Sequence, residues 1–339
     1  MINVAIIGVG GIAGGHIAAY HVLDGARLAA LCDKDPERAQ GKDRTITINI
    51  DTGEQKPLKV KKAYTDYREC LADPEIDMVD ICLPSDLHAP VAIAALEAGK
   101  HVLCEKPMAL NVEDCDRMIA AAQAHNRLLM VAQVIRFWPE YLALKELVDS
   151  SKYGKVRTAT FRRLSSVPRW TSDGWMTEPR RGGGCTLDLH VHDADFINYL
   201  LGLPREVYAR GVEEDYGMSS IMAEYRYDDE KVVFAESAWL PSPEVPFRMP
   251  FIVYLERAVV DFDNGPLKVY PVEGEPYAPE LSPIGPMTAE ITYFLQCVKN
   301  GVQPRESSPW STRETIRMIL AEVESVRTGR PVDLEPVMA

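Results

Sequence analysis

The segment VAIIGVGGIA, residues 4–13, decides the fold of the N-terminal half. Its apolar run has the length of a buried strand, and a glycine-rich turn then opens helix-like sequence at 12–23. The turn matches the pattern G-x-G-x-x-G/A: the first glycine allows a tight turn, the second admits a pyrophosphate, and the third small residue lets helix and strand pack closely. Free N–H groups at the helix N-terminus attract phosphate. The segment therefore predicts a dinucleotide site formed by Gly8, Gly10, Gly11, Ile12 and Ala13.

An acidic residue supports this interpretation. Residues 28–32 form a second apolar run that ends at Asp33, about 20 residues after the glycine turn. A carboxylate there accepts hydrogen bonds from the ribose hydroxyls of an adenosine and repels a 2′-phosphate, so we expect NAD in preference to NADP. The neighbouring Lys34 keeps NADP open as the alternative, and Asp33 also fits an ordinary turn.

The same alternation continues along the first 135 residues. Apolar runs at 78–83, 101–104 and 128–134 alternate with helical patterns at 88–98 and 112–125. Continuous apolar strands separated by helices indicate a parallel sheet covered on both faces. We therefore expect an α/β Rossmann domain, a doubly wound parallel sheet, over residues 1–135. We interpret residues 41–62 as an insertion, with Thr45–Ile50 and Lys59–Ala63 as the two arms of a hairpin.

Residues 136–339 have a different pattern. Helical patterns at 139–148, 187–200, 288–298 and 312–327 accompany strand-like runs at 156–163, 206–212, 220–227, 232–240, 251–255, 258–262 and 267–272. Consecutive alternating strands joined by short turns favour an antiparallel sheet. We expect an α+β domain with a large, mostly antiparallel open sheet.

Composition excludes several classes of protein. The chain has 339 residues, 46% of them hydrophobic and 26% charged, with a net charge of −13. An acidic chain lacks the basic patches that nucleic acids and anionic membranes require, and no apolar run has the length of a membrane span. The seven cysteines are scattered, which argues against a disulfide framework and against a metal site. We expect free thiols and, because the N-terminus lacks a basic region and a cleavage site, a cytoplasmic protein.

Two segments contain residues suited to proton chemistry. Lys106, in the sequence Glu105-Lys106-Pro107, follows a strand, and its ammonium could stabilise a developing alkoxide, although most lysines are solvated surface charges. In the second segment a glycine run precedes Asp188, His192 and Asp195, which lie at i, i+4 and i+7 and share a helical face. A histidine with a carboxylate one turn away is an oriented general base, or an ordinary helix ion pair.

A metal site at the same place is the less favoured alternative. His190 and His192 are two residues apart, so on a helix they point in directions about 200° apart. The two imidazoles would therefore not share a metal ion.

These motifs together resemble the Gfo/Idh/MocA oxidoreductases, the glucose–fructose oxidoreductase and inositol dehydrogenase family, from about residue 3 to about 334. The marks are the glycine turn, Asp80-Ile81-Cys82-Leu83-Pro84-Ser85-x-x-His88, Glu105-Lys106-Pro107, the glycine run with Asp188-x-x-x-His192, and Glu324-Ser325-x-x-Thr328-Gly329-Arg330. The resemblance implies hydride transfer between a nicotinamide and a carbinol carbon of a sugar, inositol or related polyol. It also implies a homodimer or homotetramer formed through the C-terminal sheet.

The resemblance assigns roles residue by residue. Lys106 is the catalytic lysine, His192 the general acid/base and Asp188 its partner. Pro84, Ser85, His88, Glu105 and Lys106 contribute to the cofactor site, with Glu105 beside the nicotinamide ribose. The segments between the last Rossmann strand and the glycine run offer further candidates for substrate binding besides His192. These are Arg136, Trp138, Tyr141, Arg163 and Trp175, each of which could equally belong to a core or an interface.

Two departures from the family pattern leave the substrate open: His190 stands where glycine is usual, and residues 41–62 are inserted. Three other functions remain as alternatives. The first is an NADPH-dependent keto-sugar or aldose reductase, and the second is a non-catalytic cofactor-binding sensor. The third is a hydroxy-acid or amino-acid dehydrogenase, which would require an arginine clamp for a carboxylate.

Overall fold

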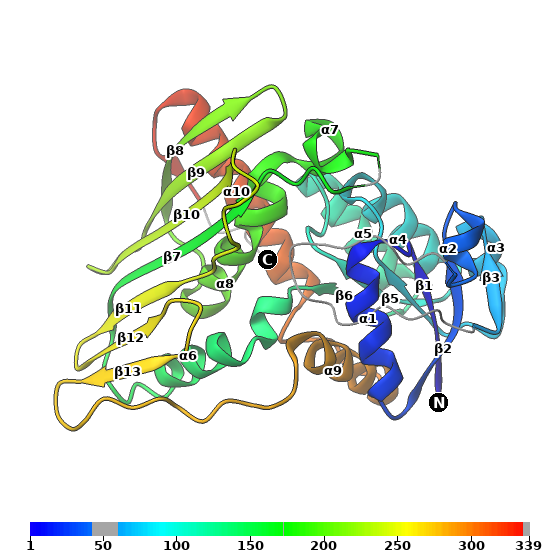
Figure 1. Ribbon diagram of the computed structural model, residues 1–339, viewed down its shortest axis with the longest axis horizontal. Coiled ribbons are helices and arrows are strands. Elements are labelled where there is room, and N and C mark those ends of the chain that lie inside the picture. Colours follow the sequence, from blue (N-terminus) through cyan, green and yellow to red (C-terminus); the bar gives the residue numbers. More distant parts are fainter. Residues whose placement is uncertain (43–59, 172, 335–339) are drawn as a thin grey trace. The chain divides into compact units, whose positions relative to one another are not determined.

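The computed structural model describes residues 1–42, 60–171 and 173–334, and these form two compact units (Figure 1). The first unit comprises Met1–Val134, Trp170–Trp175 and Gly285–Arg313, and the second comprises Ile135–Arg169, Met176–Ile284 and Glu314–Ala339. Two segments that we expected in the second domain, 170–175 and 285–313, thus cluster with the first unit. None of the helices in the described part of the chain has the length and apolar character that crossing a lipid bilayer requires.

The first unit is built on a parallel sheet of order β3-β2-β1-β4-β5-β6. Its strands are β1 (Ile2–Ile7), β2 (Ala26–Cys32), β3 (Lys62–Tyr64), β4 (Met78–Ile81), β5 (His101–Glu105) and β6 (Leu129–Ala132). Every residue of β4 and β6 is buried, which explains the continuous apolar runs. The α/β Rossmann prediction is confirmed.

Helices cover both faces of this sheet. They are α1 (Gly11–Val22), α2 (Pro36–Ala39), α3 (Tyr67–Ala72), α4 (His88–Glu97), α5 (Val112–Ala124) and α9 (Pro286–Asn300). The chain moves outward from β1 through β2 to β3 on one side of the sheet, and from β4 through β5 to β6 on the other. Because βαβ crossovers are right-handed, α1 and α4 therefore cover opposite faces. Helix α9 packs beside α1, and α5 packs beside α4.

Strand β3 corrects part of the sequence interpretation. We assigned residues 59–63 to the arm of an inserted hairpin, but Lys62–Tyr64 instead pair in parallel with Ala30–Cys32 of β2. Three residues are too few to show a hydrophobic period, so the pattern did not distinguish a sheet strand from a hairpin arm. The rest of the hairpin interpretation falls on residues 43–59, outside the described residues.

The second unit contains an eight-stranded sheet of order β13-β12-β11-β7-β10-β9-β8-β14. The strands are β7 (Val156–Ser166), β8 (Glu206–Glu214), β9 (Gly217–Arg226), β10 (Val232–Leu240), β11 (Phe251–Leu255), β12 (Ala258–Phe262), β13 (Lys268–Pro271) and β14 (Val332–Asp333). All neighbours are antiparallel except β7 and β10, which run parallel. The mostly antiparallel open sheet is therefore confirmed.

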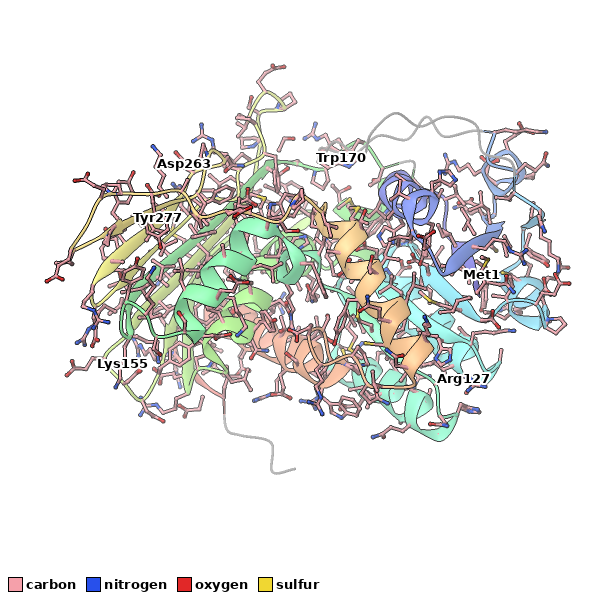
Figure 2. The ribbon with its side chains drawn as sticks, turned by 90° about the horizontal axis from the view of Figure 1, so that it is seen from below. Met1, Arg127, Lys155, Trp170, Asp263 and Tyr277 are labelled. Atoms are coloured by element: carbon pink, nitrogen blue, oxygen red, sulfur yellow. The ribbon has the colours of Figure 1, made fainter. Side chains whose placement is uncertain are left out.

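Helices α6 (Pro139–Asp149), α8 (Val191–Leu201) and α10 (Pro309–Thr328) accompany this sheet. The short segments are α7 (Pro179–Gly182), the 3-10 turns η1 (Ser85–Leu87), η2 (Val134–Phe137) and η3 (Trp175–Thr177), and the π-helical turn η4 (Thr186–His190). Tyr277 lies beside the edge strand β13, where its backbone pairs with that of Val269 (Figure 2). Side chains alternate along the strands, so one face of the sheet is core and the other is exposed.

Candidate active site

The glycine turn of the first unit has the geometry that a dinucleotide requires. Gly8 has a φ of +93°, and a Cβ on it would lie 2.6 Å from the carbonyl oxygen of Cys82 in the loop after β4. At Gly10, by contrast, no described atom lies within 4 Å of a Cβ position. Among the described residues, none caps the N-terminus of α1 with its side chain. A helix N-terminus that no side chain caps suits a pyrophosphate.

Asp33 lies where the sequence placed it, at the end of β2, and it is tied to the glycine turn. Its carboxylate accepts hydrogen bonds from the backbone N–H of Val9, at 2.8 Å, and of Asp35, at 2.9 Å. A carboxylate offers about four acceptor positions, so two remain for ribose hydroxyls. The side chain of Lys34 is 82% exposed and lies 3.8 Å from the Asp173 carboxylate.

Glu105, at the end of β5, is turned into the protein. One carboxylate oxygen lies 2.9 Å from Nε2 of His16, and the other accepts a hydrogen bond from the backbone N–H of Lys106 at 3.0 Å. Burial raises the pKa of Glu105. The hydrogen bond to His16 and the charge of His16 lower this pKa by more, so the net shift is downward. Both oxygens of this carboxylate therefore have protein partners. Its expected place beside the nicotinamide ribose remains a prediction.

His16 is a residue that the sequence analysis missed. It lies on α1, is fully buried, and its Nδ1 lies 2.8 Å from a carboxylate oxygen of Asp80 on β4. The Tyr20 hydroxyl donates to the same oxygen at 3.0 Å. A usable signal was present, because an aspartate within a fully apolar strand must find a buried partner.

Three residues at this network could together offer ligand atoms to a metal ion. Ligand atoms of His16, Asp80 and Cys82 lie within 4.8 Å of one another. Both imidazole nitrogens already lie at hydrogen-bond distance from carboxylates, however. We therefore interpret the cluster as a hydrogen-bonded link between α1, β4 and β5.

His88 acts as a bridge between two loops. Its Nδ1 lies 2.7 Å from the carbonyl oxygen of Pro107 and its Nε2 lies 2.8 Å from that of Leu83. Burial lowers the pKa of His88. Pro84 is half-buried and Ser85 is buried at the start of η1. These contacts hold the loop after β4 against the loop after β5.

Lys106 lies directly after β5 and is half-buried. The peptide bond between Lys106 and Pro107 is cis. Position and partial exposure suit a lysine that meets a small molecule at the carboxyl end of a parallel sheet.

In the second unit the glycine run leads into η4. Gly183 and Gly184 have φ values of 74° and 71°, and a Cβ on Gly184 would lie 3.0 Å from the backbone nitrogen of Met218. We expected one continuous helix over 187–200, but its first turn is π-helical and α8 begins at Val191. Asp188 lies on the π-turn and His192 on α8, both half-buried. Such π-segments occur frequently at functional sites.

Buried ion pairs account for two arginines that we expected to bind substrate. Arg136 donates to both oxygens of Asp195, each at 2.6 Å, and Arg163 donates to both oxygens of Asp193, at 2.9 and 3.0 Å. Both arginines are 1% exposed. Asp195 and Asp193 thus form buried ion pairs with these arginines, and the expected part of Arg136 and Arg163 in substrate binding stays a prediction.

The three aromatic candidates are placed differently from one another. Tyr141 is fully buried, and its hydroxyl donates to the carbonyl oxygen of Met249 at 3.0 Å, so it is a core residue. Trp138 caps α6 in the second unit and is half-buried. Trp175 is also half-buried and belongs to the first unit.

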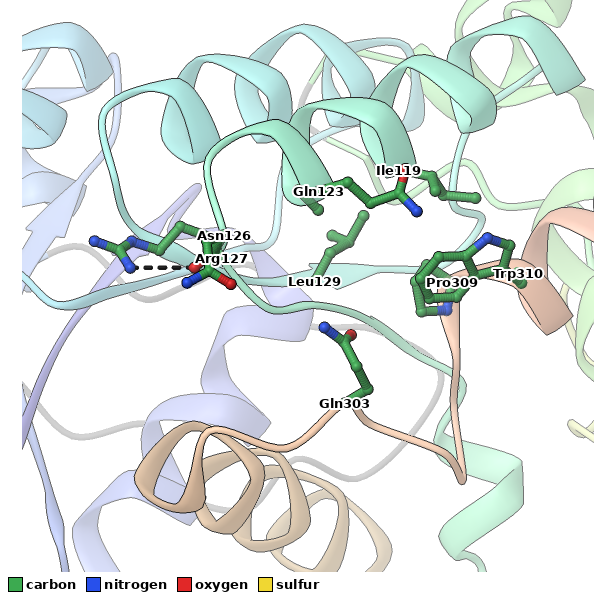
Figure 3. A pocket seen from close by; sticks show the side chains of 9 residues that line it. Ile119, Gln123, Asn126, Arg127, Leu129, Gln303, Pro309 and Trp310 are labelled. Atoms are coloured by element: carbon green, nitrogen blue, oxygen red, sulfur yellow. Dashed lines mark hydrogen bonds between the residues drawn. The ribbon is translucent and has the colours of Figure 1, made fainter.

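A small cavity lies at the start of β6, an edge strand of the first sheet (Figure 3). Its lining comes from the end of α5, the start of β6 and the start of α10, and includes Gln123, Leu129 and Trp310. Its volume of about 40 Å³ is far below the roughly 300 Å³ at which small-molecule sites begin. The cavity faces the amino end of β6, away from the glycine turn.

Comparisons with known proteins agree with this architecture. Residues 2–133 match the model described as "Oxidoreductase family, NAD-binding Rossmann fold", and residues 141–257 match the GFO/IDH/MocA C-terminal domain. The chain therefore belongs to the Gfo/Idh/MocA family.

The sequence identity to individual relatives is low. The chain is 32% identical to a myo-inositol 2-dehydrogenase of Thermotoga maritima over 63% of its own length and 60% of that protein's. It is 27% identical to a 1,5-anhydro-D-fructose reductase of Ensifer adhaerens over 81% of its length and 85% of that protein's. The chain thus spans about three fifths of the first relative. An aldose–aldose oxidoreductase from Caulobacter crescentus shares the fold, with a TM-score of 0.85, 23% identity, and 98% and 99% of the two chains covered.

Proposed function

We propose that this protein is an NAD(H)-dependent oxidoreductase that transfers a hydride between the nicotinamide and a carbinol carbon of a sugar, an inositol or a related polyol. The observation that carries the proposal is the glycine turn joined to Asp33. The Val9 N–H holds the Asp33 carboxylate at the end of β2, near the N-terminus of α1, which no described side chain caps. The substrate class is supported by the names of the relatives, which act on inositol and on an anhydro sugar.

The residues of the chain supply the proton chemistry. The nicotinamide, when bound, accepts or returns the hydride. His192 accepts the proton of the substrate hydroxyl as general base, and Asp188 orients its imidazole and stabilises the cationic form. Lys106 stabilises the developing alkoxide with its ammonium group. In the reverse direction His192 donates the proton to the carbonyl oxygen.

The cofactor preference is the first quantity to measure. We expect a fluorescence titration of the full chain to give tighter binding of NADH than of NADPH. Asp33→Asn should weaken NADH binding by about tenfold, because it loses a charge-assisted hydrogen bond to the ribose. Lys34→Ala is the matched control: as an exposed neighbour, it should leave the affinity for NADH unchanged.

The reductase and sensor alternatives predict different results. Tighter binding of NADPH, reduced in Lys34→Ala, would instead indicate a keto-sugar or aldose reductase. A sensor would bind NADH yet oxidise no sugar or inositol in a broad panel. If neither cofactor binds and the purified protein retains none, the dinucleotide site itself is refuted.

We further propose that the chain forms a homodimer or homotetramer through the exposed face of its eight-stranded sheet. Met222, Phe234 and Tyr254 are 60%, 41% and 45% exposed. Strand register places all three on the same face, since Phe234 pairs with Thr160, Thr160 pairs with Ile252, and Met222 pairs with Glu236. Large apolar side chains exposed on one face, here beside the ion pair of Arg162 and Glu236, are typical of a protein interface.

A further inference from the structure

We propose that His190 is a positioning residue, whose side chain fixes the π-helical turn η4 that bears Asp188 and leads into His192. The inference deepens the proposed function and rests on it, because those two residues are the proposed acid/base pair. Within the second unit, His190 links η4 to three other elements.

The side chain of His190 contacts three other elements of the second unit. Its Nε2 lies 2.8 Å from a carboxylate oxygen of Glu322 on α10 and 3.2 Å from the hydroxyl of Tyr225 on β9. Its Nδ1 lies 3.0 Å from Oγ of Ser237 on β10. His190, Glu322 and Ser237 are each 0% exposed. A helix and two strands that are distant in sequence therefore hold one imidazole.

The turn needs such contacts because its own backbone is an uncommon one. π-Helical turns are rare and occur mostly as single turns joined to α-helices. Gly183 and Gly184 directly before the turn contribute no side-chain packing. Cys185 and Leu189 pack against Val167 and Trp239, but apolar contact is non-directional. The hydrogen bonds of His190 are directional, so they fix the rotation of the turn.

The contact between His190 and Glu322 favours one placement of the turn η4 over other placements. A fully buried carboxylate is costly unless hydrogen-bond partners face it, and Nε2 of His190 lies 2.8 Å from one of its oxygens. Any shift of the turn would separate the two groups inside the core. The pair thereby penalises alternative placements of Asp188 and His192 more than an apolar pair would.

The test compares three variants of the full chain. His190→Leu combined with Glu322→Leu removes both polar groups at once, so that no buried charge is left unpaired. His190→Gln keeps a side-chain N–H that can donate to Glu322. Ser325→Ala is the matched control, since Ser325 is equally buried on α10, where its hydroxyl bonds to the backbone of Ala209 and Arg330.

Three readouts separate positioning from general stability: kcat and KM for a polyol, the Kd for NADH, and hydrogen–deuterium exchange of the amides at 186–192. In the double variant we expect kcat to fall by about tenfold or more, as for a small displacement of a reacting group. The exchange at 186–192 should rise and the Kd for NADH should stay unchanged. His190→Gln should restore most of kcat, and Ser325→Ala should alter none of the three readouts.

The proposal is overturned if the double variant keeps its kcat, if exchange at 186–192 does not rise, or if Ser325→Ala has the same effects. Failure of the proposed function looks different: the unchanged protein would then oxidise no polyol. In that case the exchange measurement alone decides whether His190 holds the turn.

Discussion

At the scale of single residues, the catalytic roles proposed for Lys106 and His192 are tested by substitution. We expect Lys106→Ala and His192→Ala each to lower kcat by about 100-fold or more, the usual effect of removing a general acid/base. For His192→Ala the Kd for NADH should stay within about twofold, because the effect lies in the chemical step. Lys106 is also assigned to the cofactor site, so its variant is judged on kcat. The exposed residues Lys299 and His125 provide matched alanine controls. Unchanged turnover in both variants would refute these catalytic assignments.

His16 makes a prediction about pH and stability. Burial lowers its pKa, but the Asp80 carboxylate and its hydrogen bond raise the pKa more, to well above the ordinary value of 6.5. A raised pKa in the folded state stabilises the protein fully below about pH 6.5, and this contribution is lost as the pH rises through the folded pKa.

Urea denaturation between pH 6.5 and pH 8 measures this effect. We expect the free energy of unfolding of the unchanged protein to fall relative to that of His16→Gln, by up to about 1.4 kcal/mol per pH unit. His125→Gln, on an exposed histidine, should follow the unchanged protein. A difference between the unchanged protein and His16→Gln that stays constant over this range would show that His16 gains no proton on folding.

At the scale of elements, two glycines of one turn have separable tasks. Gly8→Ala should lower the free energy of unfolding by about 1–3 kcal/mol, because a residue with a φ of +93° is strained and its Cβ meets the Cys82 carbonyl at 2.6 Å. Gly10 has a φ of −88° and surrounding space for a Cβ.

Gly10→Ala should therefore keep the melting temperature yet weaken NADH binding by about tenfold or more, equivalent to about 1.4 kcal/mol. Thermal denaturation and NADH titration of the same two preparations test both expectations. Equal loss of stability in the two variants would show that Gly10 serves the fold rather than the cofactor.

The elements also show what the sequence could and could not predict. The boundaries expected for β11 and β12 match the structure, since clear alternation and turn residues delimit them. The glycine turn was equally predictable, because its requirements lie within ten consecutive residues. The π-turn η4 was not, because hydrophobic spacing does not encode a change of hydrogen-bond register. Nor were the partners of Arg136 and Arg163, which lie 59 and 30 residues away along the chain.

At the scale of the whole molecule, the exposed sheet face determines the expected assembly. We expect light scattering coupled to gel filtration to give a dimer or tetramer, and Phe234→Glu to shift the mass to that of a monomer. A twofold interface repeats every substitution on both subunits, so one change places two carboxylates in an apolar contact.

Val272→Glu is the matched control for this experiment. Val272 is 75% exposed but lies just beyond β13, outside the strands that form the apolar face. The same change of charge there should leave the mass unchanged. A monomeric unchanged protein, or an oligomer that survives Phe234→Glu, would refute the proposed interface, because two carboxylates buried in it should weaken the association strongly.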